Sequence, residues 1–175
     1  LGTSFVKVGQ HLSLRRDLFP PDYLAELQKL QDDVKPFPTA EAIRAIELAF
    51  GKPPQQLFVR FDEEPLAAAS VAQVHGARTF AGHEVIVKVL RPGVAEQVDR
   101  DMRLAAAIVR FLSHFSRVLT QYRAEAVVLE VWATLKRELD LREEARNVHR
   151  FAAAFRDDPR VDVPDVIEGM SSETV

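Results

Sequence analysis

Two strand-like runs joined by a tight turn constrain the fold of this chain more than any other feature. Residues 71–80 and 84–91 have the composition of β-strands, and valines alternate strictly along the second run. Ala81-Gly82 supplies turn residues between them, and a further run, residues 57–61, completes the pattern. We therefore predict an α+β fold with a small antiparallel sheet.

Helical periodicity dominates the chain before this sheet. Residues 3–51 show apolar side chains at helical spacing, and proline-rich segments divide them into separate helices. Thr39 has the residue type and the position of an N-cap, so we predict that it caps a helix over residues 39–50. The N-terminal part is therefore predicted to be a helical extension.

Helical periodicity returns after the sheet. The apolar spacing predicts one long helix over residues 94–119, followed by two helices that begin near Ala124 and Leu141. Residues 161–167 alternate again, and we predict a further strand there.

The composition narrows the classes of function. With 175 residues, of which 47% are hydrophobic, the chain can bury one sizeable core, and its formal net charge of −3 gives no electrostatic case for nucleic-acid binding. It has no cysteine, which excludes disulfides and thiolate metal sites, and its five histidines show no metal-binding spacing. We therefore predict no metal site. Charged residues interrupt the longest apolar stretch, so we predict no membrane span, and we also predict no signal peptide.

An alanine-rich motif precedes the second strand of the hairpin. Ala67-x-Ala69-x-x-Ala72-x-Val74 has the spacing of the kinase phosphate loop Gly-x-Gly-x-x-Gly-x-Val, with alanine at every glycine position. Lys88 follows fourteen residues after Val74. Glycines let backbone N–H groups close over phosphates, whereas alanine restricts positive φ. The motif therefore predicts a nucleotide that is held differently from the nucleotide of ordinary kinases.

Lys88 is the first candidate catalytic residue. Strand alternation places it on the face of Ile86, where its ammonium could neutralise phosphate charge if a carboxylate held it in place. Glu144, fifty-six residues later at the start of a predicted helix, is the candidate partner. The residues alone also allow a plainer interpretation, in which Lys88 is a surface lysine and Glu144 an acidic group favoured at a helix N-terminus.

Two further motifs have weaker signals. Lys7 and Gln10 share one face of the first predicted helix, and Gly9 between them permits close approach of another element. Glu138 and Asp140 place two carboxylates two residues apart at a helix junction. Each motif by itself is also typical of an ordinary helix surface.

Taken in this order, the motifs resemble the UbiB family of atypical protein-kinase-like proteins, which is linked to ubiquinone biosynthesis. The resemblance is carried by segments along the whole chain: residues 5–10, 18–20, 65–75, 87–93, 138–140 and 144–145. It implies a helical extension over residues 1–54 and a kinase-like N-lobe over residues 55–175, with inserted helices before an αC-type helix. It also implies that the catalytic and metal-binding loops belong to a C-lobe beyond Val175, in a longer parent protein.

The resemblance also implies roles for individual residues. Lys88 is similar to the kinase β3 lysine and Glu144 to its αC partner, while Val74 and Ile86 would cover the adenine, although the family usually has alanine at the position of Ile86. The residues of the alanine-rich phosphate loop would be Ala67, Ala68, Ala69 and Ser70. The family's hallmark extension would correspond to Lys7, Gly9 and Gln10, with the lysine near Glu138 and Asp140.

Cofactors and partners follow from the same resemblance. It implies binding of ATP or ADP, with ADP favoured by the alanine loop, and Mg²⁺ in the full-length parent. Lipids or quinone-biosynthesis proteins are the implied partners, and the implied location is the cytoplasm or the periphery of a bacterial inner membrane, reached through the parent protein. Two other interpretations stay open: a non-catalytic pseudokinase-like module that binds lipid, quinone or protein, and a scaffold without a nucleotide site.

Overall fold

The computed structural model divides into two compact units. The residues that it describes are 3–13, 20–28 and 35–175. The unit that we call the helical unit comprises residues 1–35, 69–71 and 93–136. The other, the sheet unit, comprises residues 36–68, 72–92 and 137–175. The boundaries of these two units differ from the predicted ranges 1–54 and 55–175. The division into a helical extension and a kinase-like N-lobe stays a prediction.

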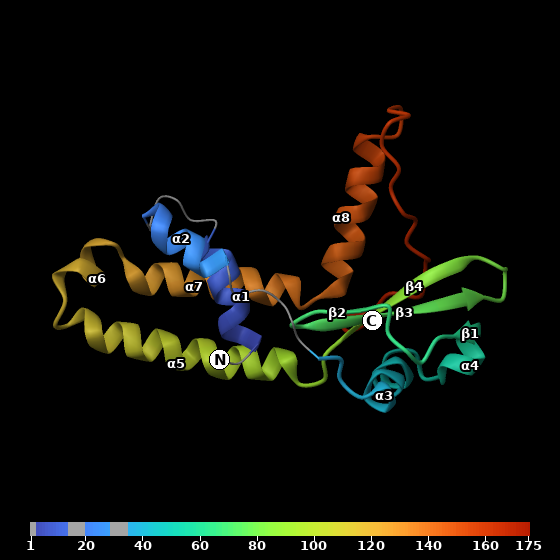
Figure 1. The fold of residues 1–175 in the computed structure, drawn as a ribbon, viewed down its shortest axis with the longest axis horizontal. Coiled ribbons are helices and arrows are strands. Elements are labelled where there is room, and N and C mark those ends of the chain that lie inside the picture. The colour runs from blue at the N-terminus through green and yellow to red at the C-terminus, as the bar shows by residue number, and fades with distance from the viewer. Residues whose placement is uncertain (1–2, 14–19, 29–34) are drawn as a thin grey trace. The chain divides into compact units, whose positions relative to one another are not determined.

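The sheet has four antiparallel strands arranged around β3 (Figure 1). Their bounds are β1 (Phe58–Phe61), β2 (Ala67–Ala68), β3 (Ala72–Thr79) and β4 (Glu84–Leu90). Strand β4 pairs with β3 along one edge, and β1 and β2 share the other edge. At the turn between β3 and β4, Gly82 has a positive φ of 90° and its N–H donates to the Thr79 carbonyl oxygen at 2.9 Å. The predicted α+β class and the antiparallel hairpin are confirmed.

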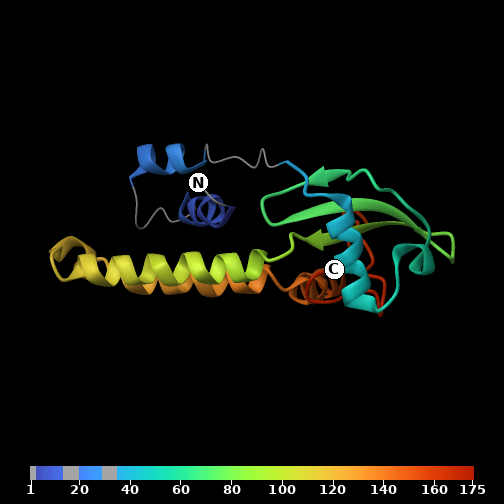
Figure 2. The ribbon, with the colours of Figure 1, turned by 90° about the horizontal axis from the view of Figure 1, so that it is seen from below.

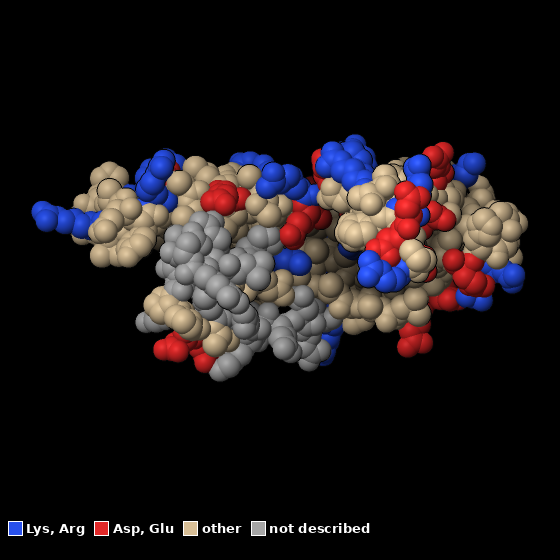
Figure 3. Space-filling model, turned by 90° about the horizontal axis from the view of Figure 1, so that it is seen from above, with Lys and Arg blue, Asp and Glu red and all other residues tan. Residues whose placement is uncertain are grey.

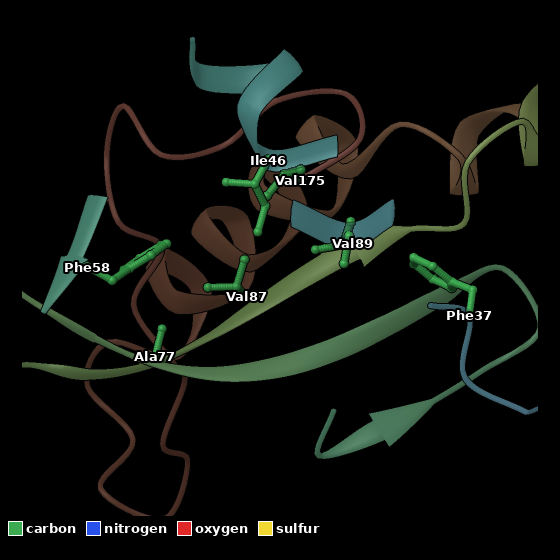
Figure 4. Packing of buried hydrophobic residues seen from close by; sticks show 8 residues of the cluster. Phe37, Ile46, Phe58, Ala77, Val87, Val89 and Val175 are labelled. Carbon is green, nitrogen blue, oxygen red and sulfur yellow. The ribbon is translucent and has the colours of Figure 1, made fainter. Parts of the chain in front are cut away.

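One face of this sheet packs on helix α3 (Thr39–Phe50), which is followed by the short helix α4 (Pro54–Leu57). Figure 4 shows side chains of the resulting core: Phe37, Ile46, Phe58, Ala77, Val87, Val89 and Val175. Ile46 and Val89 are completely buried. Removing a side chain of this size from water contributes about 1.5–3 kcal/mol, so the cluster fixes the face of the sheet that it covers.

Helix α3 begins at the predicted residue, but Thr39 does not cap it. The cap position belongs to Pro38, which has no side-chain donor or acceptor. The Thr39 hydroxyl instead donates to the Glu63 carbonyl oxygen at 2.8 Å. The helix ends as expected at Gly51, whose left-handed φ of 68° lets its N–H donate to the Glu47 carbonyl oxygen.

The C-terminal part of the sheet unit corrects a second prediction. Helix α8 (Leu141–Ala154) begins where the sequence indicates, but residues 161–167 form no strand. Pro164 interrupts this segment and cannot donate to a sheet ladder. The chain meets the sheet later, where the Leu90 N–H donates to the Thr174 carbonyl oxygen at 2.9 Å.

In the helical unit, helices α5 and α7 lie side by side (Figures 1 and 2). The helices here are α1 (Thr3–Ser13), α2 (Pro21–Gln28), α5 (Val94–Ser113), α6 (Arg117–Gln121) and α7 (Ala124–Glu138), of which the last reaches into the sheet unit. The single helix predicted over residues 94–119 is divided, because Ser116 leaves the helical conformation and its hydroxyl oxygen caps α6 by accepting from the Leu119 N–H. No helix among the described residues has the length and apolar content needed to cross a membrane.

A polar cluster joins α5 to α7. The Asp99 carboxylate accepts hydrogen bonds from the Trp132 indole N–H at 2.9 Å and from the Lys136 ammonium at 3.1 Å. The Lys136 ammonium also lies 4.9 Å from the centre of the Trp132 ring. These contacts lower the pKa of Asp99, with the Trp132 hydrogen bond as the largest cause. The cluster therefore favours the ionised form of Asp99 in the folded helical unit.

Candidate functional site

The central feature of the candidate site is an ion pair between β4 and α8. The Lys88 ammonium donates to the Glu144 carboxylate at 2.6 Å, across fifty-six residues of sequence. The two side chains are 38% and 54% exposed. An ion pair this exposed contributes about 0–1 kcal/mol to stability. The expected contact is therefore present, and its importance is to hold the lysine in position rather than to stabilise the fold.

Strand alternation explains why the Lys88 side chain points away from the core. Val87 and Val89 point into the core, so Ile86 and Lys88 point to the opposite face of the sheet. Lys88 lies directly opposite Val74 of β3, and residues opposite each other in an antiparallel pair share a face. The predicted grouping of Val74, Ile86 and Lys88 on one face is therefore present in the structure.

The start of α8 positions Glu144. Asp140 caps the helix by accepting from the Arg142 N–H at 3.0 Å, and the Arg142 guanidinium grips the same carboxylate at 2.8 and 2.9 Å. These hydrogen bonds from Arg142 hold the pKa of Asp140 below its usual range. Glu143 pairs with Arg146 on its own helix at 2.6 Å. Asp140 and Glu143 thus pair with arginines close to them in the sequence, whereas Glu144 pairs with Lys88 of the sheet.

The alanine-rich motif forms a hairpin turn between β2 and β3. Its first two residues, Ala67 and Ala68, pair with β3, and residues 69–71 make the turn. Among the described residues other than glycine, only Arg123 has a positive φ, so the alanine turn contains none of the left-handed positions that glycines permit. Ser70 is completely buried, and its hydroxyl has no hydrogen-bond partner among the described residues.

Leu66 extends the candidate site and was not singled out from the sequence. Its N–H donates to the Val74 carbonyl oxygen at 2.8 Å, and its side chain is 66% exposed. A Cβ added to Gly76 would lie 3.6 Å from the Leu66 side chain, and Gly76 is opposite Ile86, which is 68% exposed. Leu66, Val74, Gly76 and Ile86 together form what we call the apolar platform. A glycine inside a strand pattern signals such a close approach and could have revealed Leu66.

A chain of buried hydrogen bonds fixes β3 from the core side. The Phe37 N–H donates to Gln73 Oε1 at 3.1 Å, and Gln73 Nε2 donates to His75 Nε2 at 2.9 Å. His75 Nδ1 then donates to the Asp62 carbonyl oxygen at 2.8 Å, because a carbonyl oxygen only accepts. Gln73 and His75 are completely buried. Val74 lies between them in the chain, so this satisfied network holds it on the side of Lys88.

The predicted extension motif lies on α1 of the helical unit. Gly9 is buried there, and Lys7 and Gln10 are half-buried. Glu138 and Asp140 belong to the sheet unit. The approach of Lys7 to these two carboxylates stays a prediction, as do the roles assigned to Ala69 and Ser70 in the turn.

Figure 3 shows basic and acidic side chains mixed on the face that it displays. Within residues 3–13, 20–28 and 35–175, no three histidine, aspartate or glutamate side chains come together as metal ligands. The chemistry that these residues offer is therefore a positioned ammonium beside an exposed apolar surface.

Known proteins are similar to this chain in sequence and in fold. Residues 29–175 match the ABC1 atypical kinase-like domain. The chain is 42% identical over 175 residues to the "Probable protein kinase UbiB" of Sodalis glossinidius, covering 100% of this chain and 32% of the relative. It is also 42% identical over 166 residues to the protein of the same name from Pseudomonas fluorescens, covering 95% of this chain and 31% of the relative. The chain thus spans about a third of the length of these curated relatives.

A solved structure is similar as well. The complex of Rv3197 with erythromycin, from Mycobacterium tuberculosis, matches with a TM-score of 0.59 and 32% sequence identity. The match covers 95% of this chain and 42% of that chain.

Proposed function

The chain belongs to the ABC1 atypical kinase-like family, and on that basis we propose that its sheet unit binds an adenine nucleotide, ATP or ADP. The observation that carries the proposal is the 2.6 Å contact between Lys88 and Glu144 beside the apolar platform. A lysine held by a carboxylate offers a fixed positive charge for phosphate oxygens. The reaction in the full-length protein is then that of an atypical kinase or ATPase.

The apolar platform supports binding of the base. Leu66 and Ile86 are largely exposed on the same face of the sheet as Lys88, and a flat base gains by covering such apolar surface. With the phosphates at Lys88, the base lies against the exposed side chains of Leu66 and Ile86. Ile86 is larger than the alanine usual in the family at this position, so it brings the platform closer to the base.

The alanine turn supports a preference for ADP over ATP. Its residues contain no positive φ, so their backbone N–H groups cannot converge as those of a glycine-rich loop do. A terminal γ-phosphate depends most on such convergent donors. The diphosphate therefore loses less than the triphosphate when glycines are replaced by alanines.

Mg²⁺ normally accompanies nucleotide phosphates and is held by one or two carboxylates together with the phosphates themselves. We expect this ion in the full-length protein. The name of the relatives supports a place for the full-length protein in ubiquinone biosynthesis. Lipids and quinone-biosynthesis proteins are then its proposed partners, at the periphery of a bacterial inner membrane or in the cytoplasm.

Substitution of Lys88 tests the proposal. In the full-length protein, Lys88→Met removes the charge that meets the phosphates, so we expect nucleotide hydrolysis to fall by about 10²–10³-fold. Glu144→Gln should lower it less, because the lysine remains but is held less firmly. Turnover is measured as phosphate release, and nucleotide binding by calorimetry.

Two matched controls accompany these variants. Lys52→Met removes an exposed lysine of the same unit, and Glu143→Gln removes the carboxylate that pairs with Arg146 on α8. Both should retain hydrolysis close to that of the unaltered protein. Full turnover in Lys88→Met would show that the nucleotide assignment is wrong.

A specific observation also favours a second role, as an interaction module. The segment from the end of α5 to the residue after α6 carries a set of exposed apolar side chains: Ile108, Phe111, Leu112, Phe115, Val118 and Tyr122. The rings of Phe111 and Phe115 meet edge to face, with their centres 5.3 Å apart. Exposed aromatic clusters of this kind are typical of surfaces that bind partners. This role is compatible with nucleotide binding because it uses other elements.

A further inference from the structure

Helix α5 has two apolar faces, and the fold buries only one of them. An α-helix turns about 100° per residue, so Met102 and Ala106 share one face, and both are buried. Ile108, Phe111 and Leu112 lie on the opposite side of the helix and are exposed. A helix that is apolar on two sides is stable when both are covered. The described residues therefore leave the second apolar face of α5 without a covering.

This exposed face continues past α5 to the end of the hairpin that α5 and α7 form (Figures 1 and 2). Phe115, Val118 and Tyr122 are all more than half exposed there. We call residues 108–123 the hairpin end. It presents aromatic and aliphatic side chains together at one extremity of the helical unit.

The hairpin end is also basic. Residues 102–124 contain four arginines and no aspartate or glutamate. The nearest acid on α7, Glu125, pairs with Arg110 at 2.9 Å. Arg117 and Arg123 are exposed, and neither has an ion pair within the described part of the chain. Positive charge without a neutralising partner therefore lies beside the exposed apolar face.

Arg123 holds its charge on a strained backbone. It follows Tyr122 at the end of α6, and its φ of 50° is the one left-handed value outside glycine in residues 3–13, 20–28 and 35–175. Helices that end in this way usually have glycine there, because a Cβ makes the conformation costly. Figure 3 shows basic side chains at the α6 end of the helical unit. Backbone strain clusters at functional positions, so an arginine here favours a role for its charge.

We propose that the hairpin end docks on a membrane surface that contains anionic phospholipid. Phe111, Phe115 and Tyr122 then lie at the level of the headgroups, where aromatic rings are favoured. Arg117 and Arg123 pair with lipid phosphates, because basic side chains are attracted to an anionic surface. The inference rests on the proposed role as an interaction module, and it names the partner.

Shape and charge favour a membrane over a protein partner. A specific protein interface buries about 800 Å² on each side, which needs a broad surface rather than the narrow end of a hairpin. A second copy of this chain is disfavoured by charge. In a two-fold contact the same patch faces itself, so the arginines of the two copies would repel each other.

Vesicles of defined composition test the inference on the full-length protein. The readout is amide hydrogen exchange in residues 108–122. Exchange should slow with vesicles of phosphatidylcholine and phosphatidylglycerol, and much less with phosphatidylcholine alone. The double variant Arg117→Gln, Arg123→Gln should need at least about tenfold more anionic lipid for half of this slowing, since each basic residue near such a surface contributes about fivefold. Phe115→Ser should raise the required lipid at least about fivefold, because an inserted ring is lost.

Matched variants in the sheet unit are the controls. The double variant Arg44→Gln, Arg150→Gln makes the same change in net charge at exposed positions of α3 and α8. Phe151→Ser removes a ring that is 51% exposed on α8. Both should respond to vesicles like the unaltered protein. Slowing that is equal with and without phosphatidylglycerol, or that is unchanged in the variant of Arg117 and Arg123, would overturn the inference.

The same readout separates this inference from the role on which it rests. Exchange in residues 108–122 that slows with rising protein concentration, and not with vesicles, would mean that the hairpin end binds a second copy. The role as an interaction module would then stand and the inference would fail. If neither vesicles nor protein concentration slows the exchange, both fail. Nucleotide binding at Lys88 is measured separately and depends on neither result.

Discussion

The sheet unit and the helical unit bury their apolar side chains in different ways. In the sheet unit, α3 covers one face of the sheet, and Ile46 of α3 and Val89 of β4 are completely buried between them. In the helical unit, buried residues such as Met102 and Leu135 lie along one side of α5 and α7, while Phe115 is 77% exposed. A sheet with one face covered by a helix has its other face available to bind a ligand. Two helices that bury only one side leave apolar side chains exposed, where a partner could bind.

Polar contacts differ between the two units as well. The sheet unit contains a completely buried polar chain, which runs through Gln73 and His75. The helical unit keeps its Asp99 cluster at the surface, where that side chain is 28% exposed. Buried networks fix one arrangement because an unmade bond is costly, while surface clusters depend on the protonation state of their acids. The two units should therefore respond differently to core truncation and to pH.

The largest expected effect is in the core of the sheet unit. Ile46→Ala should lower the free energy of unfolding by about 2–5 kcal/mol, because it leaves a cavity under the sheet. Hydrogen exchange should show the loss in β3 and β4. Leu48→Ala, on the same helix at an 85% exposed position, is the control and should have little effect. A loss of less than about 1 kcal/mol in Ile46→Ala would contradict the contrast drawn between the units.

A smaller effect is expected at Asp99. Asp99→Asn weakens the hydrogen bonds from Trp132 and Lys136, so the helical unit should lose about 1–2 kcal/mol at neutral pH. Asp101→Asn on the same helix is the control. Exchange of the amides of α5 and α7 gives the measurement.

The pH dependence of this effect has a definite sign. The pKa of Asp99 is lowered in the folded state from its ordinary value of 3.8, mainly by the Trp132 hydrogen bond. Its contribution to stability is therefore complete above that value, and it is lost as the pH falls below 3.8 through the folded pKa. Acid should narrow the difference between the unaltered protein and Asp99→Asn, and a difference that grows in acid would contradict the assignment.

The smallest effect is expected on the exposed surface of the helical unit. Phe115→Ser should change the free energy of unfolding by no more than about 0.5 kcal/mol, since the side chain is already in water. Chemical denaturation measures this change. A loss above about 1 kcal/mol would mean that Phe115 is packed in solution, and the contrast between closed core and open seam would weaken.

The sequence predicts those parts of the fold that depend on local periodicity. Alternation places Lys88 and Ile86 on one face, and helical spacing marks the start of α8 near Leu141, which brings Glu144 to Lys88. The contact between these two residues was the expected one. Their catalytic role stays a prediction, since geometry shows position and not turnover.

Features that depend on distant partners were not predictable in the same way. Thr39 has the side chain of a cap, but its hydroxyl bonds to Glu63, which lies beyond the next helix. The alternation of residues 161–167 is typical of a strand, yet they do not join the ladder. Leu66 and Asp62 reach the candidate site because of how they lie against Gly76. Local pattern fixes which face a side chain takes, but not which remote backbone it meets.

The fit of Asp62 against Gly76 also limits how this sheet can evolve. A methyl group at position 76 would lie 2.5 Å from the carboxylate, so even alanine requires the aspartate to move. A lineage that replaces the glycine must therefore also reposition or replace the acid. The two positions should mutate as a pair, and this joint inheritance would make the identity of one readable from the other.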